Sequence, residues 1–255
     1  MSVQVVLVHG IRTSATMWRA QVRHLEARGA GVHALDLPGH GTRIDETFTL
    51  EGAFATIDRT VREAARHGPV LLVGHSMGGL IATEYAGSER PPPIAAFVGC
   101  GCTALPRGFG LRAYRLLMAG FNSLPGRGRL ITDALLWSTL PAETRGDFAA
   151  GGYAFGAQDD ALRSLSSLDV MAALRRIRVP VWFVNGRWDQ LRMHERLFGE
   201  LAPHAELIVV PRTTHLVTTM RPEVFNAVLD LAIATIETDA TTRASGSDEG
   251  DPLPT

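Results

Sequence analysis

The sequence has little cysteine, with only Cys100 and Cys102 among 255 residues. The two cysteines are too close in sequence to form a useful disulfide, and two thiols are too few for a typical metal site. No basic cluster indicates a phosphate or coenzyme pocket. We therefore expect two buried free thiols, no metal and no cofactor. Free thiols are typical of a reducing compartment, so the sequence predicts a cytoplasmic protein.

The sequence also lacks a charge excess and a long hydrophobic run. Its formal net charge is −1, which gives no indication of nucleic acid or an anionic membrane as a partner. No apolar run approaches the ~20 residues that span a bilayer, so no membrane span is expected. The amino terminus has no basic start and no cleavage site, and it resembles a strand rather than a signal peptide. With 45% hydrophobic residues, a sizeable core is available.

Short apolar runs alternate with segments of helical periodicity over most of the chain. This alternation predicts a doubly wound, mostly parallel sheet with helices on both faces. In such α/β sheets, ligands bind beyond the carboxyl ends of the strands. The predicted strands are 3–8, 32–35, 70–73, 94–99, 179–185 and 205–210, and the predicted core helices are 18–28, 50–67, 77–86, 193–201 and 222–236.

One stretch organises the rest, because an apolar run from Val70 leads into Gly74-His-Ser76-Met-Gly78 and then into an apolar helical pattern. A Gly-x-Ser-x-Gly motif alone is weakly informative, but its position between a strand and a helix is typical of a nucleophile turn. Side chains at Gly74 and Gly78 are expected to collide across that turn. The start of the helix would place N–H groups and partial positive charge beside Ser76.

An acid and a histidine follow later strands. Asp189 comes after the fifth strand and His215 after the sixth, which gives the chain order Ser…Asp…His associated with this turn. The fourth strand ends in Cys100 and Cys102 without an acid, which favours Asp189. Asp36 precedes a Pro-Gly turn and is expected to cap loop N–H groups. The other histidines are expected on the surface or in structural roles, with His40 in a turn and His75 directed away from the serine.

The sequence resembles the α/β-hydrolase fold superfamily, and most closely its esterases and monoacylglycerol-lipase-like members. The resemblance implies Ser76 as nucleophile, His215 as base and Asp189 as orienting acid. It also implies the backbone N–H groups of Ile11 and Met77 as oxyanion donors. The chain begins at the family's third strand, so about six strands are expected. The matching segments are Leu-Val-His9-Gly10, Asp36-Leu-Pro-Gly-His-Gly41, Gly74-His-Ser76-Met-Gly-Gly79, Gly186-Arg-Trp-Asp189 and Thr213-Thr-His215.

The alternation fails between residues 103 and 178, which is much longer than an ordinary connection of ~2–6 residues. Apolar helical patterns at 111–121, 130–140 and 160–174 predict a helical cap over the strand ends. We expect a hydrolase core at 1–102 and 179–237, the cap at 103–178, and a disordered tail at 238–255. The arginines of the insertion are scattered and are expected to form a solvated face; they are Arg107, Arg112, Arg115, Arg127 and Arg129.

Together these features predict a serine hydrolase that cleaves a carboxylic ester, thioester or lactone of a partly apolar small molecule through an acyl-enzyme. An apolar cap would exclude water and favour such a substrate. The same three residues could instead serve a lyase, a perhydrolase or a C–C bond hydrolase, because the reaction depends on the cap and substrate. A non-catalytic small-molecule receptor is a further alternative. The oligomeric state stays open.

Overall fold

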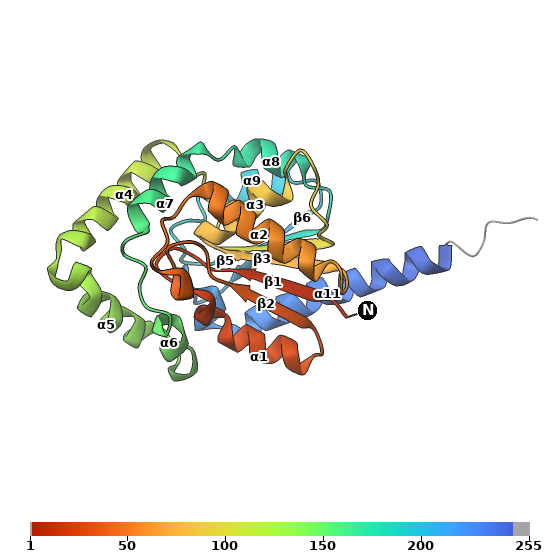
Figure 1. Ribbon diagram of the computed structural model, residues 1–255, viewed down its shortest axis with the longest axis horizontal. Coiled ribbons are helices and arrows are strands. Elements are labelled where there is room, and N and C mark those ends of the chain that lie inside the picture. Colours follow the sequence, from red (N-terminus) through yellow and green to blue (C-terminus); the bar gives the residue numbers. More distant parts are fainter. Residues whose placement is uncertain (1, 247–255) are drawn as a thin grey trace, which may run out of the picture.

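A six-stranded, all-parallel sheet forms the centre of the molecule in the computed structural model, which describes residues 2–246 (Figure 1). The strand order is β2-β1-β3-β4-β5-β6, so the chain winds outward from β1 in both directions. This result confirms the predicted fold class and strand number. The strands are β1 Gln4–Val8, β2 Gly31–Leu35, β3 Val70–His75, β4 Ala96–Cys100, β5 Val181–Gly186 and β6 Ala205–Val210.

Helices cover both faces of the sheet, with α2, α3, α8 and α9 on one face and α1 and α11 on the other (Figure 1). The helices of the two faces and of the connections are α1 Arg19–Ala27, α2 Leu50–Ala64, α3 Met77–Ala86, α9 Glu195–Leu201, α10 Val217–Met220 and α11 Pro222–Gly246, with 3₁₀ helices η1 Ala15–Trp18 and η2 Gly41–Arg43.

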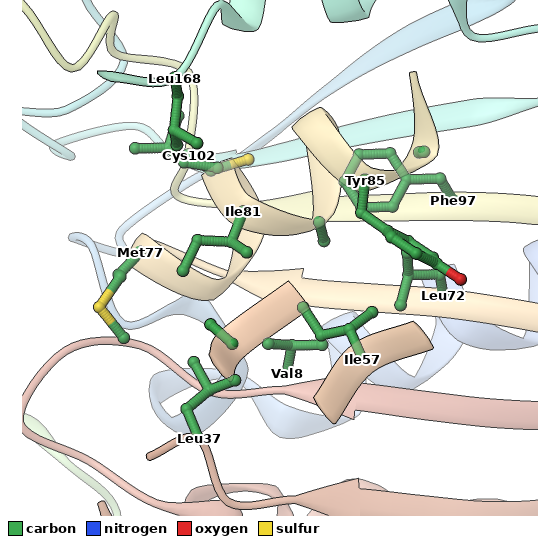
Figure 2. Packing of buried hydrophobic residues seen from close by; sticks show 14 of the residues in the cluster. Val8, Leu37, Ile57, Leu72, Met77, Ile81, Tyr85, Phe97, Cys102 and Leu168 are labelled. Atoms are coloured by element: carbon green, nitrogen blue, oxygen red, sulfur yellow. The ribbon is translucent and has the colours of Figure 1, made fainter. Parts of the chain in front are cut away.

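The apolar side chains form two clusters, one on each face of the sheet. Along β1, Val6 and Val8 belong to one cluster, whereas Val5 and Leu7 belong to the other. This division follows from the alternation of side chains along a strand, and burial on both faces explains the nearly continuous apolar runs. Figure 2 shows the first cluster, in which Ile57 of α2 and Ile81 of α3 contact the sheet. The core thus holds the ends of β1 and β3 rigidly in place.

The insertion between β4 and β5 is helical, as its periodicity predicts. Its elements are α4 Gly108–Ser123, η3 Pro125–Gly128, α5 Arg129–Thr139, α6 Ala142–Ala149, α7 Gln158–Ser164, η4 Leu165–Ser167 and α8 Val170–Arg176. The last of these, α8, packs beside α3 in the helical layer of the sheet. The backbone of α4 and α5 forms an outer arm at one end of the molecule (Figure 1).

The carboxyl-terminal helix is longer than its sequence indicates. The predicted helix ends at residue 236 and a disordered tail is expected from 238, yet α11 continues to Gly246. The residues after 237 are mostly polar, which suggests disorder. However, no proline occurs between residues 223 and 246, so no residue of this type interrupts the helix. Thr238 and Thr241 also donate hydroxyl hydrogen bonds to carbonyls one turn earlier. The remainder of the expected tail, residues 247–255, lies outside the described part of the chain.

Candidate active site

Ser76 stands between β3 and α3 in a backbone conformation that few residues other than glycine adopt. Its φ is 53° and its ψ is −118°. Such strained backbone persists only where the surrounding structure holds it, and it is commonly found at functional sites. The Ser76 N–H donates to the carbonyl of Cys100 at 2.8 Å, which ties the turn to the neighbouring strand β4. The turn therefore presents the hydroxyl at the carboxyl edge of the sheet.

The two motif glycines are required by different close contacts. A Cβ at Gly74 would lie 2.7 Å from the Cα of Gly79, so this glycine prevents a collision across the turn, as expected. A Cβ at Gly78 would instead lie 2.3 Å from the carbonyl oxygen of His9, at the end of β1. The expectation for Gly78 was wrong in this respect. Its role is to let α3 approach the loop that follows β1, where Ile11 lies.

The three residues expected to form a catalytic group lie in hydrogen-bonding contact. His215 Nε2 is 2.8 Å from the Ser76 hydroxyl oxygen. On the other side of the ring, His215 Nδ1 is 3.0 Å from Asp189 Oδ2 and 3.2 Å from Oδ1. These residues come from the ends of β3, β5 and β6, which are far apart in sequence. The sheet brings a hydroxyl, an imidazole and a carboxylate into one line.

Asp189 is buried, and its surroundings favour the charged carboxylate. Burial, the largest single effect, would raise the pKa of Asp189, but the hydrogen bond and charge of His215 oppose it. The N–H of Leu191 donates to Asp189 Oδ1 at 2.7 Å and acts in the same direction. The pKa of Asp189 consequently lies below its ordinary value. An ionised Asp189 can hold a proton on the facing ring nitrogen of His215.

The loop after β1 passes directly beside the serine turn. A Cβ at Gly10 would lie 2.8 Å from Nδ1 of the buried His75 ring and 3.3 Å from the Cβ of Ser76, so a larger residue would have to displace the His75 ring. Met77 begins α3, and its N–H is one of the first four helix amides, which have no acceptor within the helix. The structure thus brings the peptides of both expected oxyanion donors, Ile11 and Met77, close to Ser76.

Two side chains fix the peptide between Gly10 and Ile11, and the sequence analysis missed this function. His9 Nδ1 donates to the Gly10 carbonyl at 2.8 Å, and the Thr13 hydroxyl donates to the same oxygen at 2.9 Å. In a trans peptide, holding the carbonyl also fixes the direction of the following N–H. The order His-Gly-x-x-Thr was the available signal, but its meaning depends on how the loop folds.

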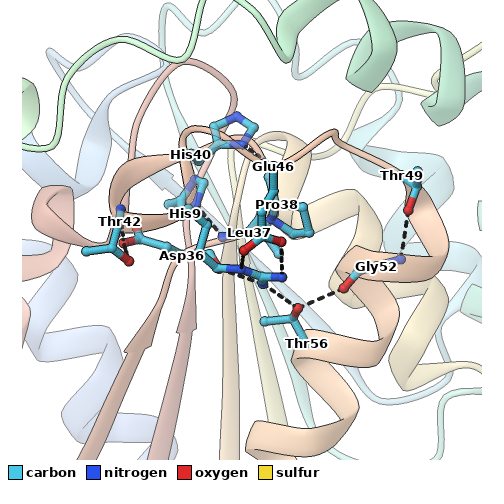
Figure 3. Close-up of polar contacts among 11 residues, drawn as sticks. His9, Asp36, Leu37, Pro38, His40, Thr42, Glu46, Thr49, Gly52 and Thr56 are labelled. Atoms are coloured by element: carbon cyan, nitrogen blue, oxygen red, sulfur yellow. Dashed lines mark hydrogen bonds and ion pairs between the residues drawn. The ribbon is translucent and has the colours of Figure 1, made fainter.

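The same loop is supported from β2. His9 Nε2 accepts the N–H of Leu37 at 3.1 Å, and Asp36 accepts the N–H of Thr42 (Figure 3). Asp36 also accepts the N–H of Ala15 at 2.7 Å. The expected capping role of Asp36 is therefore confirmed. His40 packs against His9 with ring centroids 4.9 Å apart. Burial first, and the neighbouring His40 second, lower the pKa of His9 to about 3, so this ring is neutral near pH 7.

His75 lies closer to the site than expected. Its ring packs against that of His215 at 4.9 Å between centroids, and its Nε2 lies 3.1 Å from the His215 carbonyl oxygen. Burial and the neighbouring His215 lower the pKa of His75 to about 3. A neutral His75 can donate from Nε2 to that carbonyl and so hold the backbone of His215. The expectation that His75 is directed away from the serine overlooked this contact.

Two pockets meet at Ser76 and Ile11. The first is lined by apolar side chains that include Met77, Leu80 and Leu162. The second lies on the side of His75 and His215; more of its lining residues are polar, but the surface that they expose to the pocket is mainly apolar, as in the first. Its further lining includes Arg12, Thr13, Thr132, Leu136, Phe148 and Tyr153. The sequence could not identify these walls, because nearly half of their residues come from the insertion, which packs over the strand ends.

Neither pocket contains an obvious metal-binding set. Within residues 2–246, no three histidine, cysteine or acidic side chains are grouped as a metal ion requires. Cys100 and Cys102 are buried and free, as expected. Burial raises the pKa of both thiols, which keeps them protonated near pH 7.

A class of protein is defined by the parallel sheet, the serine turn and the chain order of Ser76, Asp189 and His215 at the strand ends. Comparison with known sequences identifies this class. The chain belongs to the α/β-hydrolase family, because the sequence model of the Alpha/beta hydrolase family matches residues 5–228. The resemblance noted from the motifs is thereby confirmed.

Relatives within this family include lipases and esterases. Lipase LipV of Mycobacterium tuberculosis is 31% identical over 161 residues, which are 59% of this chain and 51% of LipV. Protein phosphatase methylesterase 1 of Bos taurus is 28% identical over 148 residues, 55% of this chain and 38% of the relative. The matches thus span about half or less of the relatives' lengths. A carboxylesterase structure from Nitrososphaera gargenis superposes with a TM-score of 0.74 at 20% identity, covering 93% and 92% of the two chains, which shows a shared fold.

Proposed function

We propose that this protein is a serine hydrolase that cleaves a carboxylic ester, or a related thioester or lactone, of a partly apolar small molecule. The observation that carries the proposal is the hydrogen-bonded line from Ser76 through His215 to Asp189. The esterase and lipase relatives support the same reaction class. In this proposal the catalytic residues are Ser76, His215 and Asp189.

The first half of the reaction forms an acyl-enzyme. The Ser76 oxygen attacks the ester carbonyl carbon while His215 Nε2 takes the hydroxyl proton. The carbonyl oxygen becomes an oxyanion, which the N–H groups of Ile11 and Met77 stabilise. Each such donor typically lowers the barrier by about 3 kcal/mol. His215 then gives its proton to the leaving oxygen as the bond between carbonyl carbon and alcohol breaks. Asp189 holds the ring and stabilises its cationic form.

In the second half of the reaction, water is the nucleophile and the Ser76 oxygen is the leaving group. His215 takes a proton from a water molecule, whose oxygen attacks the acyl carbon. The same two N–H groups stabilise the second oxyanion. His215 returns the proton to the Ser76 oxygen as the ester bond breaks, which releases the carboxylic acid and restores the free hydroxyl. No other proton carrier is needed.

The pockets suggest how the substrate is oriented. Because His215 must protonate the leaving group, the alcohol portion belongs on the side of His215, in the second pocket. The acyl portion then extends into the first, apolar pocket beside Met77 and Leu80. An acyl chain placed there removes apolar surface from water, which is favourable by ~25 cal/mol per Å². The proposed substrate therefore has an apolar acyl chain, and its alcohol portion lies beside His215 against a lining that is also mainly apolar.

The test is hydrolysis of p-nitrophenyl esters of increasing acyl length by the protein and its Ser76→Ala variant. We expect hydrolysis by the native chain and loss of at least about 10³-fold in the variant, since the hydroxyl oxygen that attacks is absent. Loss of labelling by a fluorophosphonate should accompany it. Equal hydrolysis by the variant would remove Ser76 from the proposed role. Turnover of β-diketones or cyanohydrins without ester cleavage would identify a different reaction on the same residues.

A further inference from the structure

The arm formed by α4, η3 and α5, residues 108–139, exposes large apolar side chains. The exposed fractions are 76% for Leu116, 81% for Leu130 and 69% for Trp137. Leu124 and Ile131 are also exposed. In Figure 1 the arm lies at the end of the molecule opposite the projecting end of α11. Five of the eleven exposed large apolar side chains in the described part of the chain thus lie on this one two-helix arm, and such a concentration is typical of an interaction surface.

Helix α5 is apolar on two opposite faces. Its inner face buries Leu136 and places Thr132 in the second pocket. Its outer face carries Leu130, Ala134 and Trp137, which share one stripe because they are spaced by four and three residues. A helix at a water-facing surface normally has a polar outer face, and a helix that is apolar all round is normally covered. Arg145 of α6 lies over the Trp137 ring, with its guanidinium carbon 4.3 Å from the ring centroid, but Trp137 and Leu130 stay exposed, so the outer stripe is open to a further partner.

The charge of the arm indicates which partner fits. Residues 108–139 contain four arginines and a single acid, Asp133, although the whole chain has a net charge of −1. Asp133 accepts the hydroxyl of Tyr153 and forms an ion pair with Arg129. The four arginines are all exposed, and they are Arg112, Arg115, Arg127 and Arg129. The local excess of three positive charges is concealed by the balanced total.

We propose that the arm binds the surface of a bilayer containing anionic lipids. The apolar stripe would enter the acyl boundary, and the arginines would contact the headgroups, as in amphipathic helices that lie in a membrane surface. Trp137 suits this position because its indole favours the interface. A second copy of the chain is a poorer partner, since a symmetric contact would bring two arms of equal positive charge together.

This contact is peripheral. Among residues 2–246, no helix is both long enough and apolar enough to cross a bilayer. Thr132 and Leu136 on the inner face of α5 line the pocket that contains Ser76 and His215. A bound arm would thus hold one wall of the site at the lipid surface, where apolar esters concentrate. Surface binding itself needs no hydrolysis, so it can be tested separately from the proposed reaction.

The experiment is co-sedimentation of the full chain with vesicles of phosphatidylcholine, alone or mixed with phosphatidylglycerol. We expect binding to the mixed vesicles that weakens at high salt. Leu130→Ser/Trp137→Ser should lower the partition coefficient at least about tenfold, because the apolar stripe is lost. Arg115→Gln/Arg127→Gln should lower it roughly 25-fold on anionic vesicles only, about fivefold for each arginine. Hydrolysis of a short water-soluble ester should stay unchanged, which also reports that each variant is folded.

Matched controls carry equal changes elsewhere on the surface. Ile44→Ser/Leu231→Ser removes two exposed apolar groups, and Arg23→Gln/Arg66→Gln removes two exposed charges outside the arm. Both controls should bind vesicles like the native chain. The proposal is overturned if the native chain does not bind anionic vesicles, or if the arm variants and controls bind equally. It is also overturned if light scattering shows a dimer that only the arm variants dissociate.

Discussion

At the scale of single residues, Thr13 is the least obvious contributor to the proposed chemistry. Its hydroxyl holds the Gly10 carbonyl, and this peptide carries the N–H of Ile11. Thr13→Val should lower kcat about tenfold with KM little changed, because a misdirected donor stabilises the oxyanion less. Steady-state kinetics on one p-nitrophenyl ester would measure both constants.

A matched variant separates the effect of the Thr13 hydroxyl from the effect of changing the size of the side chain. Thr13→Ser keeps the hydroxyl and should retain most of kcat. If Thr13→Val and Thr13→Ser have equal kcat values, the contact with the Gly10 carbonyl does not position the Ile11 N–H.

At the scale of secondary-structure elements, the contact between α3 and the end of β1 positions the serine turn. Gly78→Ala would place a Cβ 2.3 Å from the His9 carbonyl oxygen, which must displace backbone. We expect a loss of about 1–3 kcal/mol in the free energy of unfolding, together with lower activity. Urea unfolding followed by circular dichroism would measure the change.

The control for this prediction is Gly120→Ala in α4. A Cβ at Gly120 meets nothing within 4 Å. Alanine favours helix over glycine by up to about 1 kcal/mol, so this variant should be unchanged or slightly more stable. Effects of the same sign and size at both positions would show that helix propensity, rather than the approach of α3 to β1, determines the result at Gly78.

The elements that form the two pocket walls allow the substrate orientation to be tested. Met193 lies between β5 and α9 and lines the first pocket, whereas Thr132 on α5 lines the second. Met193→Trp should lower kcat/KM about tenfold for long acyl chains and spare acetates, because it narrows the proposed acyl pocket. Thr132→Phe should instead lower kcat/KM for esters with large alcohol portions, when esters of one acid with different alcohols are compared. The test uses esters that vary in both acyl length and alcohol size. If Met193→Trp affects the choice of alcohol and Thr132→Phe the choice of acyl chain, the acyl portion occupies the second pocket and the alcohol the first.

At the scale of the whole molecule, buried histidines link stability to pH, because burial lowers the pKa of His40 as well as those of His9 and His75. The pKa values of His9 and His75 are lowered from 6.5 to about 3. The unfolded chain therefore binds more protons than the folded chain between these values, so stability falls as the pH drops below 6.5. Each histidine contributes at most about 1.4 kcal/mol per pH unit.

Urea unfolding at a series of pH values would measure this dependence. His75→Gln should give a shallower loss of stability between pH 6.5 and about 4, since one of the buried rings with a lowered pKa is removed. The lowered pKa values of Asp36 and Asp189 act only at lower pH, below their ordinary value of 3.8. A free energy of unfolding that stays constant over the histidine range would contradict the neutral, buried state of these rings.

The sequence predicts the repeated elements of this molecule well, because strands buried on both faces, such as Val70–His75, leave a continuous apolar signal. It also places Ser76, Asp189 and His215 at strand ends. It fails where the outcome depends on distant contacts. The contact between His75 and His215 joins residues 140 positions apart. The pocket walls depend on how the insertion packs, and the end of α11 depends on weak local propensities.

The division into a core at 1–102 and 179–237 and a cap at 103–178 stays a prediction. The packing of α8 against α3 favours a boundary before α8, because this helix covers the sheet rather than the site. Limited proteolysis that cuts between α4 and α7 while leaving α8 attached to the core would support that boundary.

The central claim is that Ser76 carries the acyl group during turnover. The most direct measurement is the mass of the protein quenched in acid shortly after mixing with p-nitrophenyl butyrate, followed by peptide mapping. The account predicts one added butyryl group on the peptide containing Ser76, absent from Ser76→Ala. The account would be contradicted by ester cleavage in which the acyl group is found on another residue, or in which no transient adduct forms.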